Sequence, residues 1–284
     1  MKNATILTLV SKNCSEGDLR GMIENARAED AHLAVLVLGA APQLPLYSYG
    51  VSPYSPAIFP EDWPERFLAE SEAVSKKAKE LETLLQNESI SGDVTVVNCE
   101  ASQIPDAVAR RAMVSDLCIL TPELCAAGNV FDPAVFGVLF GSPIAIVVNG
   151  AQNGSAIKPK RVFVAWNAGL PSARAVQQAM PMLRQAQQVT IGIIDPVMTE
   201  DRDGENPGSD LAKWLSQHGC KVEVSQYPSG GKEIGDCIIG RAKETGADLV
   251  VMGAYGHSKF REGIFGGTTR TLIKQQDLAV LLAH

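Results

Sequence analysis

The sequence lacks several features that would assign it to a compartment or to a metal site. No run of about 18 apolar residues occurs among its 284 residues, so we expect no membrane-spanning helix. The first residues, MKNATILTLVSKNC, lack the long apolar core and cleavage site of a signal peptide. The six cysteines form no CxxC pair and have no histidine at metal-ligand spacing. We therefore expect a cytoplasmic protein with reduced thiols and no metal held by the protein alone.

The sequence is also poor in positive charge. Its net charge is -7 and it contains no block of Lys and Arg, which argues against nucleic acid or an anionic membrane as a partner. The contents of hydrophobic residues, 45%, and charged residues, 20%, are those of an ordinary globular protein. The chain is long enough for two domains of about 140 residues each.

The second half alternates short apolar runs with amphipathic segments, which predicts a parallel sheet covered by helices on both faces. Ser172 is a candidate N-cap for the first helix, and Gly219 and Gly246 are candidate left-handed caps at the ends of two others. Strands are predicted at 161–166, 188–195, 221–227, 248–255 and 278–283, and helices at 171–186, 209–219, 232–246 and 268–276.

The first half repeats this order of elements. Strands are predicted at 4–11, 32–40, 93–98, 116–122 and 143–150, and helices at 16–30, 64–86, 104–115 and 133–141. We therefore predict an internal duplication into two α/β domains, 1–150 and 158–284, joined by a polar linker. A segment rich in Pro and Tyr, 41–64, is an insertion in the first domain only, with no regular period.

The fourth strand of the second half leads into a glycine-rich stretch that the first half lacks. Gly253 and Gly256 stand where the first half has Thr121 and Leu124. Backbone N–H groups approach an anion closely only where no Cβ intervenes, and the start of the following helix adds further donors. Any one of these glycines could instead serve only a tight turn or a helix entry. The residues that form this candidate phosphate site are Gly253, Gly256, Gly266, Gly267, Thr268 and Thr269.

Other side chains near this stretch have two interpretations. Thr269 could cap the helix rather than bind a ligand, and Lys259, Arg261 and Arg270 could neutralise phosphates or be solvated. Asn167 and Asp195 follow the first and second strands, whose carboxyl ends border a ligand crevice in an open parallel sheet. The segment PSGGK at 228–232 lacks the spacing of a P-loop and is interpreted as a turn before a helix.

The spacing Gly253-x2-Gly256-x9-Gly266 resembles the nucleotide loop of the universal stress protein family, and the order of elements matches over essentially the whole chain. The resemblance implies two tandem doubly wound domains of the adenine nucleotide alpha hydrolase-like type. Each would have a five-stranded parallel sheet of order 3-2-1-4-5. It also implies binding of ATP, or of ADP or AMP, with Mg2+ or Mn2+ accompanying the phosphates.

Carried over position by position, the resemblance implies a site in the second half. The base and ribose would contact Ala165, Trp166, Asn167, Ile193, Met252 and Gly253, and the phosphates would contact Gly256, Gly266, Gly267 and Thr268. The family commonly has Asp at the position of Asn167, and Ser or Thr at the position of Gly267. The amide of Asn167 can hydrogen-bond a ribose or a base edge but cannot act as a carboxylate.

Three functions remain open at this stage. The first is a nucleotide-binding module of a stress response or of regulation, without a dedicated enzyme activity. The second is an interaction scaffold that binds no nucleotide. The third is a slow ATPase, although no feature supplies a general base beside the glycine stretch. The apolar fifth strands, 143–150 and 278–283, are expected at sheet edges, where the two halves would pair as an internal pseudo-dimer. Dimerisation of whole chains is left open.

Overall fold

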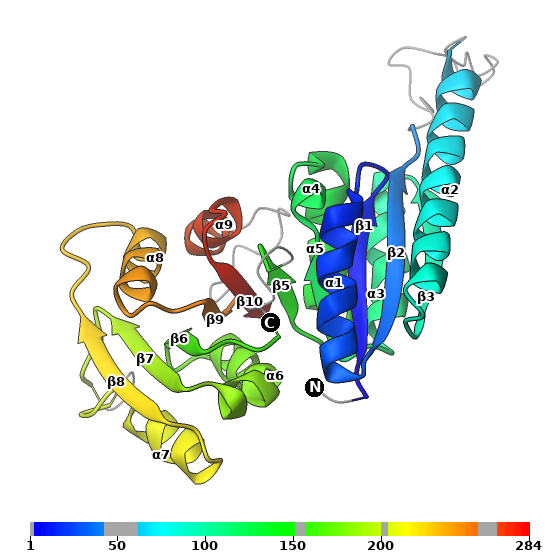
Figure 1. The fold of residues 1–284 in the computed structure, drawn as a ribbon. Coiled ribbons are helices and arrows are strands. Elements are labelled where there is room, and N and C mark those ends of the chain that lie inside the picture. Colours follow the sequence, from blue (N-terminus) through cyan, green and yellow to red (C-terminus); the bar gives the residue numbers. More distant parts are fainter. Residues whose placement is uncertain (1–2, 43–61, 151–156, 200–203, 255–265) are drawn as a thin grey trace, which may run out of the picture.

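The computed structural model describes residues 3–42, 62–150, 157–199, 204–254 and 266–284 (Figure 1). The predicted alternation of strands and helices is confirmed in both halves. The elements of the first half are β1 (Thr5–Ser11), α1 (Glu16–Glu29), β2 (His32–Ala40), α2 (Trp63–Asn87), β3 (Gly92–Cys99), the 3-10 helix η1 (Ala101–Gln103), α3 (Ile104–Ala112), β4 (Leu117–Leu120), α4 (Pro122–Cys125), α5 (Gly128–Gly141) and β5 (Ile146–Val148). Those of the second half are β6 (Arg161–Ala165), α6 (Leu170–Gln185), β7 (Gln188–Ile194), α7 (Ser209–Gln217), β8 (Val222–Tyr227), α8 (Ile234–Glu244), β9 (Leu249–Gly253), α9 (Gly267–Lys274) and β10 (Ala279–Ala283).

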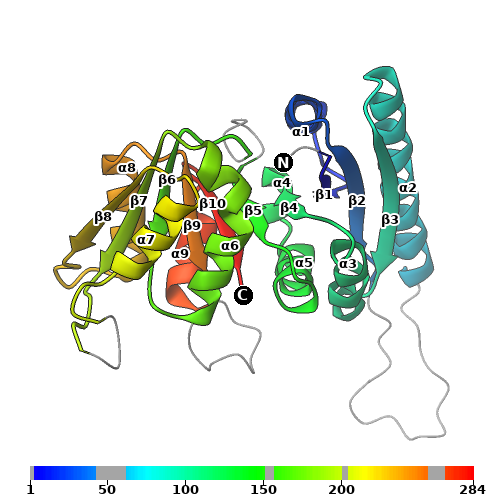
Figure 2. The ribbon, with the colours of Figure 1, turned by 90° about the horizontal axis from the view of Figure 1, so that it is seen from below.

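The strands form one sheet in the order β3-β2-β1-β4-β5-β10-β9-β6-β7-β8. Each half is a parallel five-stranded sheet of order 3-2-1-4-5, as expected. The central strands are continuous runs of Val, Ile and Leu because helices cover both of their faces. One core layer lies under α1, α2, α6 and α7, and the other lies under α3, α5, α8 and α9 (Figure 2).

The two halves meet at β5 and β10, a pair that we call the seam. This pairing is antiparallel, with Val148 opposite Val280 and Ile146 opposite Leu282, whereas the pairings within each half are parallel. The strands of the two halves therefore run in opposite directions. As a consequence, the carboxyl ends of the two sets of strands, where ligands of this fold class bind, lie at opposite edges of the sheet.

Several helix ends differ from the sequence prediction. Ser172 is not the N-cap of α6, because that helix begins at Leu170 after Gly169, and Pro171 suits the first turn. Helix α5 begins at Gly128, ahead of the predicted start, and includes Pro133 in its interior. The predicted left-handed conformations of Gly219 and Gly246 are confirmed by φ angles of 85° and 65°.

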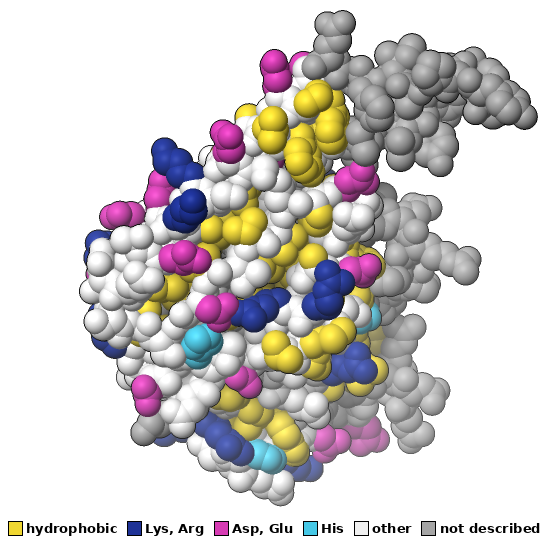
Figure 3. Space-filling view, turned by 90° about the vertical axis from the view of Figure 1, so that its right-hand side faces the viewer, with side chains coloured by type: hydrophobic (Ala, Val, Ile, Leu, Met, Phe, Trp, Pro, Cys, Tyr) yellow, Lys and Arg dark blue, Asp and Glu magenta, His cyan; other side chains and the backbone are white. Residues whose placement is uncertain are grey.

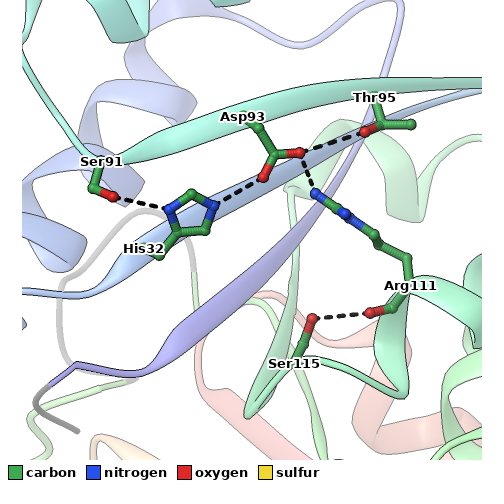
Figure 4. A network of polar contacts seen from close by, with 6 residues as sticks. All are labelled: His32, Ser91, Asp93, Thr95, Arg111 and Ser115. Atoms are coloured by element: carbon green, nitrogen blue, oxygen red, sulfur yellow. Dashed lines mark hydrogen bonds and ion pairs between the residues drawn. The ribbon is translucent and has the colours of Figure 1, made fainter.

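The outer strand β3 is held by a polar network at one end of the sheet. The carboxylate of Asp93 lies 2.8 Å from His32 Nε2 on β2 and also pairs with Arg111 on α3 (Figure 4). On the far side of the imidazole, Ser91 Oγ lies 2.9 Å from His32 Nδ1. The network thus ties two strands and a helix together at β3, which is the last strand of the sheet in the described part of the chain.

The surface beside β3 and α2 carries charges of both signs. Figure 3 shows Lys and Arg side chains interspersed with Asp and Glu over this face, with apolar side chains between them. Among the described residues, no helix combines the length and the apolar character needed to cross a membrane.

Candidate functional site

The candidate site lies at the carboxyl edge of the second half, where β6 and β9 end side by side. Ala165, the last residue of β6, pairs with Met252 on β9. Ala165 also pairs with Gly192 on β7, so three parallel strands end together. Met252 is 6% exposed and belongs to the core layer under α8 and α9, against which Ala165 also packs.

The start of α9 is exposed at this edge. Gly266 is the N-cap and Gly267 the first residue of the helix, and no side chain of the described residues caps it. Both glycines are exposed, and a Cβ added at either would meet nothing within 4 Å. The first N–H groups of a helix have no intrahelical acceptor and carry a partial positive charge. The structure therefore leaves these donors accessible, as a phosphate group requires.

Two threonines follow within the same turn and differ in exposure. Thr268 is half-buried, whereas Thr269 is only 3% exposed. Thr268 can thus add a hydroxyl to the open side of the turn. Thr269 packs into the protein, which favours a structural role for its side chain.

Gly253 is required for packing rather than for a left-handed turn. Its φ angle is not positive, and a Cβ added there would lie 2.4 Å from Ser172 N and 2.5 Å from the carbonyl carbon of Pro171. The first turn of α6 thus lies directly against the end of β9. Sequence reasoning gave Gly253 a place beside the base and ribose, and the structure adds this steric requirement.

Asn167 is exposed at the end of β6, and its side chain is oriented by the start of α6. Ser172 Oγ donates a hydrogen bond to Asn167 Oδ1 at 2.5 Å, and Gly169 N donates to the Asn167 carbonyl at 2.7 Å. Ser172 was predicted to cap the helix, and it instead holds this amide. With Oδ1 engaged, the NH2 group is the part of the amide left to donate to a ligand.

The structure does not bring Ile193 and Trp166 to the same side of the sheet as Met252. Ile193 is 2% exposed and lies in the core layer under α6 and α7, where Trp166 also packs. Ile194 is half-buried and packs on the layer that contains Met252. The alternation of side chains along a strand therefore makes Ile194 the apolar neighbour of the site. The sequence could have indicated Ile194, because side chains of successive strand residues point to opposite faces of the sheet.

Asp195 has a local role at the end of β7. It has a positive φ of 48°, and its Oδ1 accepts a hydrogen bond from Ser229 N at 2.8 Å. Hydrogen bonds from Ser229 lower the pKa of Asp195 below its usual range. Asp195 therefore holds the PSGGK segment, whose Gly230 and Gly231 have φ angles of 61° and 81°. The interpretation of PSGGK as a turn before a helix is confirmed.

Part of the predicted phosphate site falls outside the described residues. Gly256 lies in the range 255–265, as do Lys259 and Arg261. The insertion 41–64 is described only at its ends, and its last residues begin α2.

The corresponding edge of the first half is filled by protein side chains. Thr121 and Leu124, which align with Gly253 and Gly256, are both fully buried, and Thr121 Oγ1 donates to the carbonyl of Leu9 at 3.0 Å. The short helix α4 follows β4 directly. Glu123 is enclosed beside Cys14, which is 2% exposed. The first half thus has side chains where the second half has glycines.

The enclosed carboxyl of Glu123 predicts a pH-dependent stability. Burial raises the pKa of Glu123, and a hydrogen bond from Thr121 Oγ1 to Glu123 Oε1 acts in the opposite direction but is the smaller effect. A raised pKa in the folded state means that stability falls as pH rises from the usual carboxyl pKa through the raised one. We expect Glu123→Gln to raise the melting temperature at pH 8, with a smaller gain near pH 5, in calorimetric unfolding.

A second carboxyl provides the control for this prediction. Lys77 lowers the pKa of the exposed Glu80 through a hydrogen bond, which is the opposite direction. Glu80→Gln should therefore give no gain in melting temperature at pH 8. A Glu123→Gln variant that is equally stabilised at both pH values would contradict the assignment.

Comparison with known proteins finds a family match in the second half of the chain. Residues 159–284 match the model of the universal stress protein family, the family that the glycine spacing of this half resembles. The chain has no significant sequence match among curated proteins.

Solved structures that resemble the chain cover both halves. A universal stress protein from Archaeoglobus fulgidus is 14% identical with a TM-score of 0.67, over 99% of this chain and 96% of that one. A putative universal stress protein from Pseudomonas aeruginosa is 15% identical with a TM-score of 0.56, over 99% and 92% of the two chains. At these identities the likeness concerns the fold, and its extent agrees with a tandem arrangement.

Proposed function

We propose that the second half binds one adenine nucleotide, ATP or its di- or monophosphate, and that the chain is a nucleotide-binding regulatory module of a stress response. The observation that carries the proposal is the uncovered first turn of α9 at Gly266 and Gly267. The backbone N–H groups at this helix start suit the phosphates, since the N-terminus of a helix binds anions through its backbone and glycine leaves these groups accessible. The family match of the second half supports the choice of ligand.

The remaining parts of the nucleotide have partners at the same edge. Ala165, Ile194 and Met252 offer an apolar wall for the base. The NH2 group of Asn167, oriented by Ser172, can donate to a ribose hydroxyl or a base edge. Mg2+ or Mn2+ would bind mainly to the phosphates. Within the described ranges, no group of three or more His, Cys, Asp or Glu side chains is arranged to hold a metal.

Titration calorimetry with ATP, ADP and AMP, each with and without Mg2+, tests this proposal. We expect saturable binding with one site per chain, because side chains fill the corresponding edge of the first half. Two sites would contradict the assignment to the second half. The absence of saturable heat with any of the three nucleotides would end the proposal.

A scaffold function is the second candidate, and the filled edge of the first half favours it for that domain. Burial of Thr121 and Leu124 leaves no glycine cradle there. In this second proposal the first half binds other molecules as an interaction domain, whether or not the second half binds a nucleotide. Phosphate release with ATP that exceeds the metal-only background would instead support a slow ATPase.

A further inference from the structure

A cavity of about 350 Å³ opens between the two halves beside the seam. Its walls come from α4 and α5 of the first half and from α9 of the second half, which flank β5 and β10 (Figure 1). Phe131 lines one wall and Ile273 the other, and both are largely buried. The volume lies in the range of small-molecule sites.

The cavity carries an excess of positive charge. Arg270 and Lys274 both line it from α9, four residues apart on one face of the helix, and Asp132 lines it from α5. In the part of the chain that the structure describes, none of these three side chains forms a close ion pair. Burial raises the pKa of Asp132, and the nearby charge of Arg270 acts in the opposite direction. Burial raises the pKa of Cys125 to about 11, so this lining thiol adds no charge at neutral pH.

Hydrogen bonds that cross the seam connect the two walls of the cavity. Asn149, which follows β5, donates through Nδ2 to the carbonyl of Ile273 at 3.4 Å and to that of Gln275. These bonds hold the end of α9 on the first half. The cavity is therefore part of the junction between the halves, and a ligand there would contact both.

From this arrangement we propose that the cavity is a binding site for a small organic anion, one phosphate or carboxylate group on an apolar body. Arg270 and Lys274 bind the anionic group, and Phe131 and Ile273 contact the body. The site is distinct from the start of α9 proposed to bind nucleotide, since the residues of this helix that line the cavity begin at Arg270, and Gly266 and Gly267 are not among them. The proposal does not depend on nucleotide binding.

The test is titration of the isotope-labelled full chain with four probes, followed by backbone amide NMR. Phenyl phosphate and benzoate carry both parts of the ligand, inorganic phosphate carries only the anion, and benzyl alcohol only the body. We expect saturable shifts around Phe131, Arg270 and Lys274 with at least one of the first two probes, and weaker binding of the other two. The comparison of phenyl phosphate with benzoate identifies the preferred anionic group. A saturating probe should also raise the melting temperature.

Substitutions separate this site from general electrostatics. Arg270→Gln with Lys274→Gln should weaken binding about tenfold or more, because both charged donors are lost. Ala126→Leu should weaken it by filling the cavity without changing charge. Lys213→Gln with Lys221→Gln, remote on the α7 side, is the matched control and should bind as the unaltered chain does.

Several outcomes would overturn the proposal. One is the absence of saturable shifts with all four probes. Another is equal affinity of the probes for three variants: the Lys213/Lys221 control, the Arg270/Lys274 double substitution and Ala126→Leu. Shifts confined to Gly266–Thr269 and abolished by Gly267→Val would place the anion at the start of α9 instead. Because the cavity-filling variant retains both cations, it tests the site even if the double substitution impairs folding.

Discussion

Gly253→Ala is expected to be the most destabilising single change at the candidate site. The added Cβ would lie 2.4 Å from Ser172 N and 2.5 Å from the carbonyl carbon of Pro171, both of which are backbone atoms. No side-chain rotation can relieve such a contact, so α6 must shift from the end of β9. Overpacking of this kind costs about 3 kcal/mol, which corresponds to a melting temperature lower by about 6–12 °C for a domain of this size. Calorimetric unfolding measures it.

Gly240→Ala is the matched control for this experiment. Gly240 lies within α8, and a Cβ added there would meet nothing within 4 Å. Alanine is favoured over glycine in a helix, so this variant should melt at the same or a higher temperature. Equal melting temperatures for the two variants would refute the steric role assigned to Gly253.

Gly267→Val is expected to abolish most nucleotide affinity and to leave the fold intact. A Cβ at this position would meet none of the described residues within 4 Å, so we expect the protein to accept a side chain there. The same side chain would keep phosphates from the first N–H groups of α9. Loss of two charge-assisted hydrogen bonds, at about 1.5 kcal/mol each, predicts a loss of about 100-fold in ATP affinity. Calorimetric titration and thermal unfolding of the same sample separate the two effects.

The first half offers a matched control for this substitution. Gly128 begins α5, the helix that corresponds to α9, and a Cβ there would also meet nothing within 4 Å. Gly128→Val should therefore bind ATP as the unaltered chain does. If Gly267→Val binds ATP normally, the nucleotide is not held at the start of α9. If both variants lose binding, the effect is not local to that helix.

The predictions for Gly253 and Gly267 assign different roles to glycines that look equivalent in the sequence. Gly253 is constrained by Pro171 and Ser172 in the first turn of α6, 82 and 81 residues earlier in the chain, whereas a Cβ at Gly266 or Gly267 would meet none of the described residues within 4 Å. Spacing alone could not distinguish them, because the distinction depends on which backbone atoms lie opposite each Cα.

The prediction of fold succeeded where local pattern and packing agree. β2 and β7 are apolar runs covered on both faces, and their lengths were predicted to within a residue. Helix starts were less predictable. α5 carries Pro133 in its interior, and a proline suits the first turn of a helix better, so the pattern suggested a later start.

The sequence placed candidate site residues at the ends of strands, but it did not fix the directions of their side chains. Ile193 and Ile194 are equivalent in composition, and only their faces differ. The face follows from the register of β7 against β6 and β8, which the neighbouring strands set. Ser172 likewise resembles a helix cap in the sequence, whereas the structure places it against Asn167.

The alternation of apolar runs with amphipathic helices was sufficient to predict two α/β halves, because hydrophobic periodicity is a local property. The glycine spacing that follows the fourth strand of the second half indicated the family whose model matches that half. The antiparallel junction of β5 with β10 and the cavity beside it became evident only in three dimensions. The tertiary structure also showed that side chains fill the carboxyl edge of the first half, whereas the start of α9 is exposed at the carboxyl edge of the second half. Each of these depends on contacts between residues far apart in the chain, and such contacts leave no periodic trace in the sequence.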